Sequence, residues 1–352
     1  MSRIFITGAS GYIGGQVLHD LTAAHPDLRI RALVRSEQSA KAISAAFPNI
    51  ETVSGDLDNA AVITEEVKEA DIVLHLAATG HLKSVQTIHE ALRARSANNP
   101  AYWIQISGAS ALAAAELADS SSHVPGSASD AVFDDLDGVS DIISVIRAHP
   151  SRAVDNYVLD VAAAAGTNTP QVNTALVFPG IIYGPGQGPG NQRSIQIPSL
   201  ADAVLKRGRG VQVGRGLSRW ANVHVQDVGA LFVALVEKAI APRAAKDAQL
   251  WNTNGLYLTG VGEMPFKEIS RAVARAAAAK GFIADGDIVD EVPADEADQA
   301  LPHGRVLYGT NARGEGRRAR ELLGWSPRFG KTGLDEEIPR AVDEAAKSHG
   351  KA

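Results

Sequence analysis

Near its amino end the chain reads Thr7-Gly8-Ala9-Ser10-Gly11-Tyr12-Ile13-Gly14, between an apolar run at residues 3–7 and a segment with helical periodicity. In a strand–turn–helix unit, Gly8 permits a tight turn, Gly11 lets a ligand approach the backbone, and Gly14 lets helix and strand pack closely. The free N–H groups and positive dipole end of the helix then favour phosphate. This motif predicts a dinucleotide site, with a purely structural glycine turn as the alternative.

The second apolar run, residues 29–34, bears on which dinucleotide is bound. Sites for NAD(H) usually place an acidic residue at the end of this strand, where it accepts hydrogen bonds from the ribose. Here the strand ends in Val34-Arg35-Ser36. Because a guanidinium matches phosphate oxygens, Arg35 favours NADP(H) over NAD(H). A solvated surface arginine is the alternative interpretation.

The first half of the chain alternates short apolar runs with helical patterns. The expected strands are residues 3–7, 29–34, 50–54, 72–76, 102–106 and 172–178. Near-continuous apolar strands between helices are typical of a parallel sheet covered on both faces. The sequence therefore predicts an α/β fold with a Rossmann-type, doubly wound parallel sheet.

The regular pattern stops between residues 111 and 150, where acidic side chains lie among serines and glycines. We expect a solvated loop there, with an ordered wall of the pocket as the alternative. After residue 178 the chain becomes rich in glycine and proline. We expect a dinucleotide-binding domain at 1–180 with returns near 222–258, and a smaller, interleaved substrate lobe at 181–221 and 259–345.

Composition limits the classes of function. The 352 residues carry a net charge of −6 and include no cysteine. The acidic balance argues against a nucleic-acid partner, and the lack of cysteine excludes disulfides, thiolate catalysis and cysteine-ligated metal. No run approaches the roughly 20 apolar residues of a membrane span. We expect a cytoplasmic protein that neither enters a membrane nor binds a metal.

Several motifs occur in a fixed order along the chain. They are TGASGYIG at 7–14, GDL at 55–57, HLAA at 75–78, ISGAS at 106–110, YGPG at 183–186 and NVHVQDV at 222–228. In this order the chain resembles the extended and atypical short-chain dehydrogenase/reductases, a superfamily that includes NAD-dependent epimerases and dehydratases. The resemblance extends to about residue 340. It implies an NAD(P)-dependent oxidoreductase with a small-molecule substrate and is compatible with a homodimer.

The resemblance also assigns roles to individual positions. Ser107 would hold a substrate carbonyl or hydroxyl. For Asp56, a helix N-cap or an Asx turn is the alternative to a cofactor contact. His75 and His224 are expected to be packing residues. Cofactor contacts are implied for Thr7, Gly8, Ser10, Gly11, Tyr12, Ile13, Gly14, Asp56, Leu57, Ala77, Ala78, Phe178, Pro179 and Gly180.

One element of the family's pattern is missing. The usual catalytic pair is a tyrosine four residues before a lysine, and none of the six tyrosines has a lysine at that spacing. Arg152 takes the lysine position, where it would hold the ribose or the nicotinamide amide of the cofactor, but its pKa is too high for proton transfer. We consider His149, Tyr157 and Tyr183 as replacement proton donors, each with a structural role as the alternative.

These observations leave three functions open. The first is an NADP(H)-dependent reductase acting on a small carbonyl metabolite. The second is a non-catalytic NADP(H) sensor, suggested by the missing pair. The third is a nucleotide-sugar epimerase or dehydratase, in which Arg193, Arg209, Arg215 and Arg219 would bind a diphosphate. A solvated basic hairpin is the alternative for these arginines.

Overall fold

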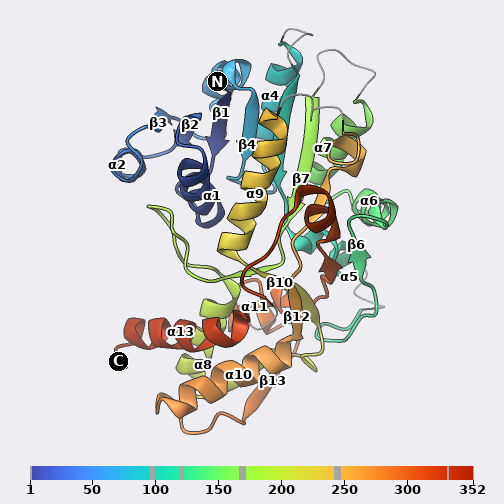
Figure 1. The fold of residues 1–352 in the computed structure, drawn as a ribbon. Coiled ribbons are helices and arrows are strands. Elements are labelled where there is room, and N and C mark those ends of the chain that lie inside the picture. The colour runs from blue at the N-terminus through green and yellow to red at the C-terminus, as the bar shows by residue number, and fades with distance from the viewer. Residues whose placement is uncertain are drawn as a thin grey trace.

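The computed structural model describes residues 2–95, 100–118, 123–165, 172–241, 247–330 and 333–351. Its centre is a seven-stranded parallel sheet in the order β11-β7-β5-β4-β1-β2-β3 (Figure 1). The chain runs outward from β1 in one direction through β2 and β3, then crosses to β4 on the other side. This reversal leaves a crevice at the carboxyl ends of β1 and β4, where doubly wound sheets bind their ligands.

The main sheet and its helices follow the predicted alternation. The strands are β1 (Arg3–Thr7), β2 (Arg29–Val34), β3 (Glu51–Ser54), β4 (Ile72–His75), β5 (Ala101–Ile106), β7 (Val172–Phe178) and β11 (Leu256–Leu258). The helices that cover them are α1 (Tyr12–Ala24), α2 (Glu37–Ala46), α3 (Ala60–Glu69), α4 (Leu82–Arg93), α7 (Ala153–Ala163) and α9 (Val225–Ile240). The predicted α/β class and parallel sheet are confirmed.

Both faces of the sheet are buried under helices. Alternate residues of β1 divide between the faces, so Ile4 and Ile6 join one hydrophobic cluster and Phe5 joins the other. The first cluster includes Val17 of α1 and Leu231 of α9. The second contains side chains of α3, α4 and α7. This packing holds the amino end of α1 at the carboxyl end of β1.

The carboxyl-terminal segments other than α9 and β11 contribute most of a smaller lobe below the sheet (Figure 1). In this lobe β10 (Arg219–His224) lies between β8 (Ile181–Tyr183) and β12 (Gly262–Pro265), and β9 (Gly210–Val213) pairs with β13 (Val289–Val292). Its longer helices are α8 (Gln196–Arg207), α10 (Phe266–Ala279) and α13 (Gly333–Ser348). Shorter elements are η1 (Ala109–Ala111), α5 (Ala114–Ala118), η3 (Asn252–Asn254), α11 (Ala297–Ala300), α12 (Gly304–Leu307) and the π-helix η4 (Ala319–Leu323).

The segment at 111–150 differs from the expected solvated loop. Within its described part, β6 (Phe133–Asp134) pairs with β14 (Gly314–Glu315), and α6 (Val139–Arg147) follows. Asp135 is fully buried and accepts backbone N–H groups of Leu258, Arg317 and Arg318, each at 2.8 Å. Burial raises the pKa of Asp135 to about 6. The loop prediction is therefore wrong for residues 133–147, which bind the carboxyl-terminal segment instead.

Among the described residues, no helix is both long and apolar enough to cross a lipid bilayer.

His75, at the end of β4, is the packing residue that the sequence predicts. Its ring is fully buried, with Nδ1 2.7 Å from the Thr7 hydroxyl and Nε2 3.1 Å from the Ser84 hydroxyl. Thus β4 is tied to β1 and α4 through one neutral imidazole. Burial lowers the pKa of His75 to about 3.

This buried imidazole makes stability depend on pH. Between pH 6.5 and about 3 the unfolded chain binds a proton at position 75 that the folded protein does not bind, so stability falls as the pH is lowered. The contribution of His75 to this slope approaches about 1.4 kcal/mol per pH unit. We would measure the free energy of unfolding by urea titration at several values between pH 7 and 4. The slope of this free energy against pH should be shallower for His75→Gln than for the unmutated protein. Equal slopes for His75→Gln and the unmutated protein would contradict the assignment.

Candidate active site

The glycine turn has the geometry that a phosphate cradle needs. Gly8 adopts φ +81°, and a Cβ there would lie 2.7 Å from the backbone of Leu76. A Cβ on Gly14 would overlap the carbonyl oxygen of Gly8. Gly11 is the N-cap of α1 and no side chain caps the helix, so the first backbone N–H groups remain available to an anion. The turn therefore fits a dinucleotide pyrophosphate.

A glycine-rich segment, residues 184–195, packs directly on this turn. The Tyr12 hydroxyl donates to the carbonyl of Gly184 at 2.6 Å, and the backbone N–H of Asn191 donates to the carbonyl of Ser10 at 3.0 Å. The segment can approach because Gly190 lies against Ser10, where a Cβ would collide with the backbone. These contacts join the smaller lobe to the cofactor end of the sheet.

A pocket of about 450 Å³ lies between the turn and this segment. One wall consists of the glycine turn and the strand ends, and the opposite wall comes from the smaller lobe. Among the described residues, Arg193 is the only charged side chain in the lining, and it is paired with Asp202 at 2.5 Å. The first wall contains Gly11, Tyr12, Ile13, Gly14, Leu76, Ala77, Ser107, Ser110, Pro179 and Gly180; the second contains Asn191, Ser194, Ile195, Gln196, Trp220 and Leu307.

The floor of the pocket holds a polar cluster built on the start of α7. Arg152 donates from Nη2 to the Ser107 hydroxyl at 3.2 Å and from Nη1 to the Ser110 hydroxyl at 3.3 Å. Its Nε donates to Asp155 Oδ2 at 2.7 Å, and this carboxylate is 1% exposed. Arg152 is not part of the lining, so its charge lies beneath the two hydroxyls.

Asp155 was not identified from the sequence. Burial raises the pKa of its carboxyl group, while Arg152 and the Ser107 hydroxyl act to lower it. Asp155 Oδ1 has no hydrogen-bond partner among the described residues. The spacing Arg152-x-x-Asp155 is the sequence feature that could have indicated this ion pair, because side chains three residues apart on a helix can contact each other.

None of the three candidate proton donors lines the pocket. The Tyr157 hydroxyl pairs with His89 Nδ1 at 2.8 Å, between α7 and α4. Tyr183 is 1% exposed and donates to the carbonyl of Phe329 at 3.3 Å, and burial raises its pKa further from neutrality. His149 lies half-buried in the turn before α7. The hydrogen bonds of Tyr157 and Tyr183 hold these two hydroxyls away from Ser107, whereas His149 stays a prediction that the structure does not test.

The expected cofactor residues divide into two groups. Gly11 to Gly14, Ala77, Pro179 and Gly180 line the pocket, whereas Phe178 is 1% exposed within the core. The Thr7 side chain is likewise turned inward, toward His75. Outside the lining lie Gly8, Ser10, Arg35, Asp56, Leu57 and Ala78.

Arg35 and Asp56 follow the ends of neighbouring strands. Arg35 is exposed and forms no ion pair within the described part of the chain, and it precedes Ser36, the N-cap of α2. Asp56 Oδ1 accepts the backbone N–H groups of Asp58 at 2.9 Å and Asn59 at 3.1 Å. The Asx turn considered for Asp56 is therefore present.

The basic residues proposed for a diphosphate lie elsewhere. Arg209 pairs with Asp290 at 3.4 Å, and Arg219 pairs with Glu263 at 3.3 Å. Arg215 is exposed on the turn after β9, outside the pocket lining. Only Arg193 reaches the pocket, so the solvated-surface interpretation fits the other three.

His224 is also a structural residue. It is 5% exposed, caps α9 by accepting the N–H of Gln226 at 3.2 Å, and stacks on Phe329 with ring centroids 3.5 Å apart. Burial lowers its pKa to about 4. The prediction of a core histidine is confirmed.

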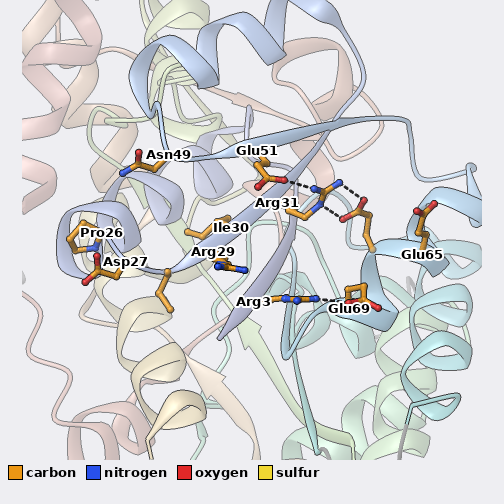
Figure 2. Close-up of a pocket in the computed structure, with 12 residues that line it drawn as sticks. Arg3, Pro26, Asp27, Arg29, Ile30, Arg31, Asn49, Glu51, Glu65 and Glu69 are labelled. Atoms are coloured by element: carbon orange, nitrogen blue, oxygen red, sulfur yellow. Dashed lines mark hydrogen bonds and ion pairs between the residues drawn. The ribbon is translucent and has the colours of Figure 1, made fainter. Parts of the chain in front are cut away.

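A second cleft, of about 700 Å³, lies at the opposite, amino ends of β1 and β2 (Figure 2). Its charges are largely paired with one another, since Arg31 binds Glu51 and Glu66 and Arg3 binds Glu69. Because parallel sheets bind ligands at their carboxyl ends, we place the active site at the glycine turn and not in this cleft.

Comparisons with known proteins show the family of the chain. Residues 4–247 match the model of the NAD dependent epimerase/dehydratase family. The chain is 34% identical over 329 residues to "Oxidase ucsJ" of Acremonium sp, covering 92% of each protein. It is 28% identical over 233 residues to a 4-hydroxy-2-methyl-3-oxo-4-farnesyl-3,4-dihydroquinoline-1-oxide ketoreductase of Stigmatella aurantiaca, covering 64% of this chain and 62% of that protein.

Solved structures support the same fold. The DesIV double mutant (dTDP-glucose 4,6-dehydratase) of Streptomyces venezuelae, with NAD and DAU bound, aligns with a TM-score of 0.64. The alignment covers 98% of each chain at 18% sequence identity. At this identity the similarity concerns the fold alone.

Proposed function

Because the chain belongs to the NAD dependent epimerase/dehydratase family, we propose that it is an NADP(H)-dependent oxidoreductase that reduces a neutral, small carbonyl metabolite. One observation carries the proposal: the glycine turn and Ser107 line the same pocket. A dinucleotide on the turn and a carbonyl compound at Ser107 would therefore share one enclosed volume.

The lining of the pocket favours a substrate without phosphate groups. The one cation that the described part of the chain places in the lining, Arg193, is neutralised by Asp202, whereas a diphosphate is normally met by several free arginines or lysines. Apolar surface comes from Ile13, Leu76 and Trp220. The names of the relatives from Acremonium and Stigmatella describe an oxidase and a ketoreductase, which is consistent with redox chemistry on an organic carbonyl or alcohol.

The bound reduced cofactor would supply a hydride to the carbonyl carbon. Ser107 would donate a hydrogen bond to the carbonyl oxygen and so orient the substrate. Arg152 would stabilise the negative charge that develops at this oxygen, since the guanidinium lies 3.2 Å behind the hydroxyl. The fixed cation would thus take over part of the electrostatic role of the family's lysine.

The choice of NADP(H) rests on Arg35, whose guanidinium is exposed and unpaired within the described residues at the end of β2. We expect Arg35→Glu to weaken NADPH binding by about 10- to 100-fold, because the change removes a charge-assisted contact with the 2′-phosphate and adds repulsion. NADH binding should change little or improve. Calorimetric titration with both cofactors measures the preference.

Arg29→Glu is a matched control for this experiment. Arg29 is an exposed arginine at the opposite end of the same strand, so the substitution makes the same change in charge far from the cofactor end. If Arg35→Glu bound NADPH as tightly as Arg29→Glu, Arg35 would have no part in cofactor choice.

The reaction itself is tested by NADPH oxidation with a panel of aromatic and aliphatic ketones and aldehydes. Turnover of at least one neutral carbonyl compound supports the proposal. Tight NADPH binding without turnover of any compound would instead favour the non-catalytic sensor. A stabilising thermal shift with a nucleoside-diphosphate sugar would favour the epimerase or dehydratase.

A further inference from the structure

The second hydroxyl on the pocket floor belongs to Ser110, a residue outside the proposed carbonyl reduction by Ser107 and Arg152. It lies against the same guanidinium as Ser107, at 3.3 Å from Arg152 Nη1, and it lines the same pocket. One planar group therefore contacts two serine oxygens that both face the proposed substrate volume.

The hydrogen-bonding capacity of arginine determines which way these hydroxyls can point. A guanidinium has five N–H donors and no acceptor, whereas a serine hydroxyl has one donor and two acceptor lone pairs. Each serine oxygen must then accept from Arg152, and neither can donate to it. The Ser110 proton is thereby left for another acceptor. The Ser107 proton is shared between the Asp155 carboxylate, whose pKa it lowers, and an oxygen bound in the pocket.

Asp155 fixes the guanidinium in this orientation. It binds the Nε and Nη2 edge through Oδ2, at 2.7 and 2.6 Å, and it is 1% exposed. An arginine in solution samples many rotamers, but a buried carboxylate holds the planar fork in one direction. With its Nε edge held by Asp155, Arg152 presents Nη1 and Nη2 to Ser110 and Ser107.

We propose that Ser107 and Ser110 form a two-hydroxyl clamp for the substrate oxygen. The Asp155–Arg152 ion pair orients the clamp, because the guanidinium donates to both serine oxygens and so leaves the two hydroxyl protons available to the substrate. The inference rests on the proposed carbonyl reduction and names the groups that bind the reacting oxygen. Ser107 and Ser110 are catalytic residues in this scheme, and Asp155 is a positioning residue that acts through Arg152.

The clamp accounts for proton transfer without the missing tyrosine. The hydride that forms the C–H bond at the carbonyl carbon would come from the reduced cofactor, which would be oxidised in the same step. The C=O π electrons move onto oxygen, which then takes the proton from the Ser107 hydroxyl. The serine oxygen recovers a proton from water in the pocket, and a proton from bulk solvent neutralises the hydroxide that remains. Ser110 donates a hydrogen bond throughout and stabilises the developing charge, while Arg152 faces both oxygens.

The first test compares Ser110→Ala with Ser110→Thr, using the best substrate from the carbonyl panel. Ser110→Ala should lower kcat by about 100-fold with little change in KM, because it removes a donor used mainly in the transition state. Ser110→Thr keeps the hydroxyl and should recover most of kcat. Ser144→Ala removes an exposed hydroxyl on α6 and should match the unmutated enzyme.

The second test addresses Asp155. Asp155→Asn should lower kcat by about 10- to 100-fold, because a neutral amide holds the guanidinium less firmly. Arg152 and Ser107 are the polar groups that act on the pKa of Asp155, which burial raises. The kcat of the unmutated enzyme should therefore fall at acid pH as Asp155 protonates, and Asp155→Asn should lack this fall.

A binding measurement separates failure of the clamp from failure of the proposed function. Benzoate carries an oxyanion, and we expect it to bind the enzyme in the presence of NADP⁺ and to bind about tenfold more weakly to Ser110→Ala. Ser110-dependent benzoate binding without any turnover would support the clamp and refute the reductase. Turnover with unchanged kcat in Ser110→Ala and in Asp155→Asn would refute the clamp and leave the reductase.

Discussion

Gly14→Ala is expected to raise the Kd for NADPH at least about 100-fold, a loss of about 2.7 kcal/mol of binding free energy. A Cβ at position 14 would overlap the carbonyl oxygen of Gly8 and would lie 2.6 Å from its carbonyl carbon. Because both atoms are backbone, only a shift of α1 away from the turn relieves the overlap. That shift moves the free N–H groups that would hold the pyrophosphate.

The same substitution should also reduce the free energy of unfolding, by about 1–3 kcal/mol, as is typical of overpacking. Fluorescence titration with NADPH and urea unfolding measure the two effects separately. Gly80→Ala is the matched control, since a Cβ there meets no atom within 4 Å. Equal NADPH affinity in Gly14→Ala and Gly80→Ala would show that the turn does not hold the cofactor.

The sequence predicts the sheet well because the physical signals are local. Each of the first strands is a short apolar run bounded by turn residues, and the glycine spacing locates the first turn. The sequence does not predict the strand β11, because three residues are too few to show a periodic pattern. Its pairing with β7 joins segments about 80 residues apart in the sequence, so no local signal indicates it. The ordered segment around Asp135 was missed for a similar reason, since its N–H partners lie more than 120 residues away.

The catalytic end of the pocket was only partly predictable. Arg152 is close to Ser107, as alignment on the family's lysine position implies, but the sequence does not show that the guanidinium would lie beneath two hydroxyls. Tyr157 is near Arg152 in sequence, and yet the α4–α7 contact with His89 directs its hydroxyl away from the pocket. Side-chain direction on a helix surface, rather than sequence distance, decides which groups meet.

Arg152→Met should almost abolish carbonyl reduction and should also lower the free energy of unfolding by about 3–5 kcal/mol at pH 8. The stability loss arises because Asp155, 1% exposed, would become a buried carboxylate without its cation. Loss of Arg152 would raise the pKa of Asp155 further, beyond the increase that burial already causes. The folded variant then binds a proton more readily than the unfolded chain does, so its stability deficit should shrink as the pH is lowered toward 5.

A double variant separates the structural role of the ion pair from its role in the reaction. Arg152→Met with Asp155→Leu removes both charges and replaces them with apolar groups, which is often nearly neutral for stability. We expect the double variant to unfold at close to the unmutated urea midpoint while its kcat stays as low as that of Arg152→Met. Recovery of kcat together with stability would mean that the ion pair serves only the fold, and that the charge beneath Ser107 has no part in reducing the substrate.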